Sequence, residues 1–180
     1  HDRCVSEAQS KVTANHEEQA LLGAIDAHRD ELLRFGHTVQ RLAEAGYHEV
    51  NTAQLFAEKL RALGLETQTG LAITGVRADL RYGPGPHVAL LGELDALACP
   101  THPLANAETG MAHACGHHQQ LTAVLGAAMA LTQCGLMAHM AGGVAFFGVP
   151  SEEYSDVDGK RAMIRQGRIG LAGGKQELLR

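Results

Sequence analysis

Residues 113–118 read His-Ala-Cys-Gly-His-His, and this short stretch constrains the fold more than any other part of the sequence. Thiolate and imidazole are borderline-soft donors that suit zinc and also bind manganese or cobalt. A thiol and neighbouring imidazoles packed beside a glycine therefore form a nucleus for metal ligation. Cys115 and His117 are the candidate ligands within it.

A pair of carboxylates follows a second informative segment. Residues 144–149 form an apolar run typical of a buried strand, and Glu152 and Glu153 come just after it. Open α/β sheets bind ligands outside the carboxyl ends of their strands. We therefore expect Cys115, His117 and one of these two glutamates to meet in one cleft. The glutamate that does not bind metal is available as the general base of a hydrolase.

Another apolar run, residues 88–91, leads into Gly-Glu-Leu-Asp at residues 92–95. An uninterrupted apolar run of this kind suits a strand covered on both faces, as in a parallel sheet. Asp95 at its end is placed to orient a metal ligand without binding the metal itself. Residues 98–114 then form a long loop, and long loops are commonly functional.

Helical periodicity appears in three places. Apolar residues recur at spacings of three and four over residues 25–42, which predicts one helix. Asn51 is predicted to cap a second helix that ends at Gly64. A third helix is predicted over residues 119–133, with its first turn against the cysteine-histidine stretch. Together with the predicted strands, these helices indicate an α/β fold with a mostly parallel sheet.

Composition narrows the class of protein. With 45% hydrophobic residues, the 180 residues can build the core of one domain or of part of a larger one. The formal charge of −5 argues against a general nucleic-acid binder. No apolar run approaches the roughly 18 residues of a membrane span, so no membrane partner is expected. Four cysteines without repeated spacing favour a reducing, cytoplasmic location.

Three further segments have plainer interpretations. Residues 1–14 are polar and aperiodic, which predicts a flexible lead-in. Gly173-Gly174-Lys175 lacks the earlier glycine and the following Ser or Thr of a phosphate loop, so it predicts a turn that opens a short helix. His113 and His118 flank the candidate ligands, and either metal or substrate binding or a hydrogen-bonded structural role is open to them.

Three motifs, residues 92–97, 113–117 and 149–153, occur in this order and together are specific. They resemble the amidohydrolase branch of the co-catalytic metallopeptidase family, which contains carboxypeptidase G, aminoacylase, the auxin-conjugate hydrolases and aminobenzoyl-glutamate hydrolase. The resemblance implies a three-layer, mostly parallel sheet flanked by helices. It also implies that residues 15–180 are the N-terminal part of a catalytic domain, without the lid domain and later histidine ligands of the family.

The resemblance further implies a site with two divalent metal ions, zinc, manganese or cobalt. Cys115, His117 and Glu153 would be metal ligands, Glu152 the general base, and Asp95 a supporting residue. His118 departs from the family pattern, because relatives usually carry Asp or Asn at this position. Relatives dimerise through the lid domain, so a homodimer of the full-length protein is compatible with this family.

The expected function is hydrolysis of an amide bond in a small molecule: an N-acyl amino acid, a dipeptide or an aminobenzoyl-glutamate-like conjugate. Water would be the nucleophile, activated by the two-metal site and Glu152. Two alternatives stay open at the level of sequence. One is a hydrolase that uses Cys115 as a nucleophile with His117, which requires a free thiolate. The other is a metal-binding relative without catalytic turnover.

Overall fold

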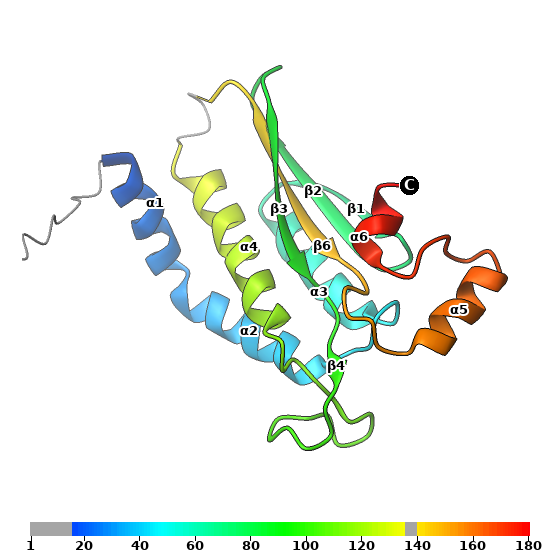
Figure 1. The fold of residues 1–180 in the computed structure, drawn as a ribbon. Helices are drawn as coiled ribbons and strands as arrows, with labels where there is room; N and C mark the ends of the chain where they lie inside the picture. The colour runs from blue at the N-terminus through cyan, green and yellow to red at the C-terminus, as the bar shows by residue number, and fades with distance from the viewer. Residues whose placement is uncertain (1–15, 136–139) are drawn as a thin grey trace, which may run out of the picture.

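The computed structural model describes residues 16–135 and 140–180. The predicted lead-in, residues 1–14, lies outside these described residues. Figure 1 shows helices packed against a twisted sheet, which confirms the α/β class. The elements in chain order are α1 His16–Ala27, α2 Arg29–Leu42, α3 Val50–Ala62, β1 Glu66–Leu71, β2 Gly75–Arg81, β3 His87–Glu93, β4 Leu97–Ala98, β5 Met111–Ala112, α4 His117–Gln133, β6 Gly143–Val149, α5 Val157–Arg165 and α6 Gly174–Leu178.

The main sheet is mixed rather than mostly parallel within the described residues. Its four strands have the order β1-β2-β6-β3, and β4 and β5 form a separate two-stranded ladder. β3 runs parallel to β6, from His87 opposite Gly143 to Glu93 opposite Val149. β2 is antiparallel to both β1 and β6. A tight turn at residues 72–74 joins β1 to β2, and so short a connection permits only antiparallel pairing.

One face of the sheet carries the core. Alternate residues of β2 and β6 pack against α2, α3 and α4 in a single buried cluster, which includes Val76, Ala78, Leu80, Val144, Phe146, Phe56, Leu60, Leu121 and Leu125. The opposite face is less covered, and Leu91 on β3 is 52% exposed. The expectation that residues 88–91 are buried on both faces is therefore not met among the described residues. These residues supply the sheet and one helical layer, and a third layer is not seen among them.

The N-terminal helical segment is interrupted, although its periodicity predicts one continuous helix. α1 ends at Ala27 and α2 begins at Arg29, with the non-helical residue His28 between them. The His28 side chain lies 2.7 Å from the amide oxygen of Gln133, at the end of α4. This long-range contact ties the junction to the neighbouring helix, and local periodicity carries no information about it.

The predicted cap of α3 is wrong. Asn51 lies inside α3, and Glu49 occupies the N-cap position. The backbone N–H groups of Asn51 and Thr52 instead donate to the Glu44 carboxylate at 3.1 and 2.8 Å. Free N–H groups at a helix start need an acceptor, and here a side chain from the preceding segment supplies it. Asn51 is therefore not needed as a cap.

Three elements converge at one edge of the sheet. β3 and β6 are parallel neighbours, so their carboxyl ends lie side by side, and α4 begins near them (Figure 1). A Cβ on Gly92 would lie 3.1 Å from the backbone of Leu121, so glycine allows β3 and α4 to approach closely. α4 begins at His117, two residues before the predicted start at residue 119, so this histidine lies in the first helical turn. None of the helices in the described residues has the length and hydrophobicity of a membrane span.

Candidate metal centre

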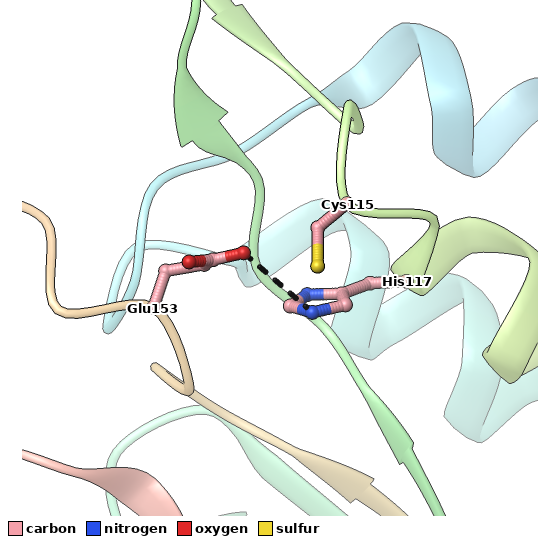
Figure 2. A group of neighbouring side chains, drawn as sticks. All are labelled: Cys115, His117 and Glu153. Atoms are coloured by element: carbon pink, nitrogen blue, oxygen red, sulfur yellow. Dashed lines mark ion pairs between the residues drawn. The ribbon is translucent and has the colours of Figure 1, made fainter.

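Cys115, His117 and Glu153 meet where the three elements converge. One potential ligand atom from each lies within 4.8 Å of the others. Figure 2 shows the Cys115 thiol and the Glu153 carboxylate both directed toward the His117 ring. The Glu153 Oε1 to His117 Nε2 distance is 3.8 Å. The structure thus brings together the three side chains that the sequence motifs pointed to.

His117 has an orientation suited to metal binding. Its side chain is only 2% exposed, and Nδ1 lies 2.8 Å from the backbone oxygen of Asp95. A carbonyl oxygen can only accept, so Nδ1 carries the proton and Nε2 of the neutral ring presents a lone pair. Nε2 has no hydrogen-bond partner, although it is buried. A ring with one nitrogen held by a carbonyl, and with the other left to face possible ligands, is usual among histidines that bind metal.

Glu93 completes a second group around the same imidazole. Glu93, His117 and Glu152 also place one potential ligand atom each within 4.8 Å of one another. The Oε2 atom of the buried Glu93 lies 2.9 Å from His117 Nε2, and Glu152 Oε2 lies 3.7 Å from it. A carboxylate oxygen and an imidazole lone pair this close repel each other unless a proton or a metal cation is shared between them. The donor set therefore fits a divalent cation.

Asp95 connects the two halves of the site. The residue is completely buried, and its Oδ2 accepts a hydrogen bond of 2.9 Å from the backbone N–H of Glu153. Its Oδ1 lies 3.4 Å from His117 Nδ1. One aspartate thus fixes the ring of His117 through its backbone and the segment of Glu153 through its carboxylate. Asp95 therefore contacts both candidate ligands, and its role in orienting them stays a prediction.

Known proteins are similar to this chain over the region of the candidate site. A profile described as "Peptidase family M20/M25/M40" matches residues 89–177, which include every residue of the two candidate groups. The chain belongs to this family. The M20 chain is 32% identical over 145 residues to thermostable carboxypeptidase 1 of Saccharolobus solfataricus, covering 77% of the chain and 36% of that protein. It is 31% identical to an IAA-amino acid hydrolase of Arabidopsis thaliana, covering 78% of the chain and 32% of the relative.

Solved structures agree with the family assignment. The M20 chain superposes with a TM-score of 0.64 on the YXEP protein of Bacillus subtilis, a dinuclear metal-binding peptidase of the M20 family. The two are 28% identical, and the match covers 79% of this chain and 40% of that protein. Of the curated relatives named above, the chain spans about a third of the length.

Electrostatics at the candidate metal centre favour a bound cation. Burial lowers the pKa of His117, but the hydrogen bonds and charge of Asp95, together with the charge of Glu93, outweigh it and raise the pKa to about 9. The Cys115 pKa is also raised, chiefly by its hydrogen bond to Glu153 and also by slight burial. Both shifts arise from carboxylates gathered around one point. Without a compensating cation, this field disfavours a free thiolate at Cys115.

Two lysines at this site have no counterpart in the sequence-based site prediction. Lys160 on α5 is 3% exposed, and its ammonium donates to the backbone oxygen of Glu153. Burial lowers the Lys160 pKa, and Tyr47 and Tyr154 offer their rings at 6.0 and 5.7 Å. Lys175 belongs to the predicted helix-opening turn, and the short helix α6 confirms that turn. No sequence pattern indicates that either ammonium would lie beside the carboxylates around His117.

The turn after β6 is held in an unusual conformation. Ser151 is buried and has φ 49, in the left-handed region that a non-glycine residue rarely adopts. Glu49 accepts the Ser151 N–H, and a Cβ on Gly46 would lie 2.7 Å from the Ser151 hydroxyl. The segment that begins α3 therefore packs tightly against the turn that presents Glu152.

Among the described residues, the other histidines and cysteines lie outside both candidate groups. The His113 and His118 rings are 5.6 Å apart, and burial, together with the neighbouring His118, lowers the His113 pKa to about 4. His113 is therefore a neutral ring near the site rather than a member of either described group. Cys99 and Cys134 are free thiols away from the cluster. Cys4 and His139 lie outside the described residues.

Proposed function

We propose that this chain forms part of a metal-dependent hydrolase of amide bonds in N-acyl amino acids, dipeptides or aminobenzoyl-glutamate-like conjugates. The convergence of two candidate ligand groups on His117 is the observation that carries the proposal. The relatives named carboxypeptidase and IAA-amino acid hydrolase support an amide substrate. The chain covers about a third of those relatives, so the activity is proposed for the full-length protein.

The similarity to a dinuclear metal-binding peptidase supports two divalent ions at this centre, each zinc, manganese or cobalt. In the proposal, Cys115, His117 and Glu153 hold metal, and Glu93 is added as a carboxylate facing the same imidazole. Thiolate and imidazole favour these borderline ions, and carboxylates add charge compensation. When bound, such ions lower the pKa of a bound water to about 7 and polarise a carbonyl oxygen.

Glu152 is the general base of the proposed reaction. It is more exposed than the other carboxylates of the cluster, with 36% of its side chain accessible, against 9% for Glu93. Glu152 can therefore meet an incoming substrate and water while its Oε2 remains 3.7 Å from His117 Nε2. In this role it accepts the proton of the attacking water and returns it to the departing amine. Asp95 keeps His117 and Glu153 in place during this transfer.

The structure weakens the cysteine-nucleophile alternative. A cysteine nucleophile must be a thiolate near neutral pH, whereas Glu153 raises the pKa of the Cys115 thiol. A metal-binding protein without turnover is distinguished by experiment, because it would retain metal but show no hydrolysis.

Metal analysis joined to substrate hydrolysis tests the proposal. The purified full-length protein should contain close to two divalent ions per chain and hydrolyse members of a panel of N-acyl amino acids and dipeptides. The Cys115→Ala/His117→Ala double variant should lose both properties. Cys99→Ala is the matched control, because Cys99 is a free thiol outside the cluster. Unchanged metal content in the double variant would refute the ligand assignment, and metal without hydrolysis would favour the non-catalytic alternative.

A further inference from the structure

Lys175 touches both carboxylates of one candidate metal group. Its ammonium forms an ion pair with Glu93 Oε1, and it also lies 3.7 Å from Glu152 Oε1. The other oxygen of Glu93 is the atom 2.9 Å from His117 Nε2. On each carboxylate, Lys175 therefore lies near one oxygen and the imidazole near the other.

The fold delivers Lys175 to this position. The backbone N–H of Gly174 donates to the Ser151 oxygen at 3.0 Å, which fastens the start of α6 to the turn after β6. Glu177 on the same helix accepts the N–H groups of Gly170 and Leu171 at 3.0 and 2.7 Å. These contacts fix the backbone on both sides of Lys175. Its approach to the acidic group is therefore set by the helix position and not only by a long, flexible side chain.

The need to compensate the charge of Glu93 explains why the Lys175 ammonium is held beside it. Glu93 has a side chain that is only 9% exposed, and a buried carboxylate is costly unless a positive partner is near. Lys175 supplies a permanent positive charge to Glu93 and, at longer range, to Glu152. A divalent ion bound to Glu93 would supply that charge instead. An ammonium and a divalent ion at neighbouring positions repel each other, so their binding to this group is mutually unfavourable.

We propose that Lys175 is an internal counter-cation that competes with metal for Glu93, while it also neutralises the neighbouring Glu152. It stabilises the group when metal is scarce and weakens metal affinity at this group. A cavity of about 130 Å³ adjoins Lys175 and is also lined by Glu152, Tyr154 and Gln176. The ammonium can move into this space when a metal ion takes its place, without displacement of α6. The inference rests on the metal centre of the proposed function and goes beyond it by assigning control of metal affinity.

Thermodynamic linkage makes the inference testable without measuring catalysis. If Lys175 and metal oppose each other, removal of the charge must tighten metal binding and destabilise the metal-free protein. We expect Lys175→Met to lower the dissociation constant of the second Zn²⁺ by roughly 5–150-fold, the range typical of coupled sites. The unfolding midpoint in chelator should fall, while the midpoint at saturating Zn²⁺ should change little. Chelator-competition titration and thermal unfolding of the full-length protein measure these two quantities.

Further variants separate charge from shape. Lys175→Gln removes the charge and keeps a polar end, so it must tighten Zn²⁺ binding as well. If Lys175→Met does not fold, the Zn²⁺ affinity of Lys175→Gln alone tests the inference. Lys175→Arg keeps the charge and should bind Zn²⁺ as weakly as the wild-type protein does. Lys59→Met is the matched control, because Lys59 pairs with Glu31 at 2.6 Å away from the site. That control should lower stability equally with and without Zn²⁺ and leave Zn²⁺ affinity unchanged.

The outcomes distinguish this inference from the proposed function. Unchanged or weaker Zn²⁺ binding in the two neutral variants overturns the role of Lys175, provided that the wild-type protein binds metal. Absence of Zn²⁺ binding in the wild-type protein overturns the metal centre itself. Equal tightening in Lys59→Met and Lys175→Met would also overturn the inference, since the effect would then not come from contact with Glu93.

Discussion

The Glu49 carboxylate and the backbone N–H of Ser151 lie 2.7 Å apart, and this contact joins the start of α3 to the turn before the acidic pair. The other oxygen of Glu49 accepts the Thr74 hydroxyl at 2.6 Å. Glu49 is completely buried, so both oxygens are satisfied within the protein. A distant glutamate thus holds the left-handed Ser151 and, through it, the direction in which Glu152 leaves the sheet.

Replacement of Glu49 by alanine should destabilise the protein by about 2–4 kcal/mol, because two buried donors lose their acceptor and a cavity forms. Urea unfolding of the full-length protein measures the change. Glu58→Ala, in the helix that Glu49 precedes, is the control because Glu58 is exposed, and it should stay within about 0.5 kcal/mol of the wild type. Equal effects of the two substitutions would show that the contact with Ser151 contributes little.

The same residue predicts a pH dependence of stability. Burial raises the Glu49 pKa to about 7; the hydrogen bonds from Thr74 and Ser151 oppose this shift, and the charge of Asp95 adds to it. The folded protein therefore binds this proton more tightly than the unfolded chain does. The contribution of Glu49 to stability is greatest below the unfolded pKa of 4.5 and falls as the pH rises to about 7.

Glu49→Gln should remove that contribution. The free energy of unfolding of the wild type, relative to Glu49→Gln, should fall by up to about 3 kcal/mol between about pH 5 and about pH 8. Groups near Glu49, including Lys160 and Tyr47, are present in both proteins, so the difference cancels most of their titration. Unfolding curves at several pH values give the comparison. A difference that rises with pH would have the wrong sign for a raised pKa.

The two adjacent glutamates should respond differently to the same substitution. Glu152→Gln removes the proposed base, so hydrolysis by the full-length protein should fall by roughly 10²–10⁴-fold while metal content stays nearly constant. Glu153→Gln should instead lower metal content, because an amide oxygen is a poorer ligand than a carboxylate, and excess metal should restore part of the activity. Kinetics and elemental analysis of both variants decide the assignment. The reverse pattern would exchange the two roles.

Gly174 should not tolerate a side chain. A Cβ there would lie 1.6 Å from the backbone oxygen of Pro150, so α6 would have to shift away from the turn. Gly174→Ala should cost about 1–3 kcal/mol, as is typical of overpacking. Gly23 in α1 has no heavy atom within 4 Å of the corresponding position, so Gly23→Ala should stabilise that helix by about 0.5–1 kcal/mol. Thermal unfolding of the two variants provides the test.

The placement of the site was predictable from sequence because its parts are local. Each motif follows an apolar run or opens a helix, and the ends of parallel strands meet at one edge of a sheet. The strand direction of β2 and the acceptor role of Glu44 were not predictable in this way. The first depends on β6 lying between β2 and β3, and the second on contact between separate segments. Periodicity describes one segment at a time and cannot reveal such pairings.

The same limit applies to the residues around the site. Glu49, Lys160 and Lys175 act through contacts that span 102, 7 and 82 positions. Glutamate and lysine are usually solvated surface residues. Their residue type therefore gives no reason to expect them beside the acidic cluster. The burial of Glu49 and Lys160 becomes evident only when the helices are docked on the sheet. Glu93 was the nearest to being predictable, since it stands within a motif at a strand end.

The register of β3 on β6 also has a consequence for handling the protein. Glu93 lies opposite Val149 in this parallel pair, and a slip of one position would turn the side chains of β3 to the opposite face. Glu93 would then leave the cluster, while Cys115 and His117 would remain at the start of α4. In the proposed metal centre, only correctly paired molecules assemble the full donor set. The number of metal ions bound per chain is therefore a direct assay of how much of a preparation has reached its native strand pairing.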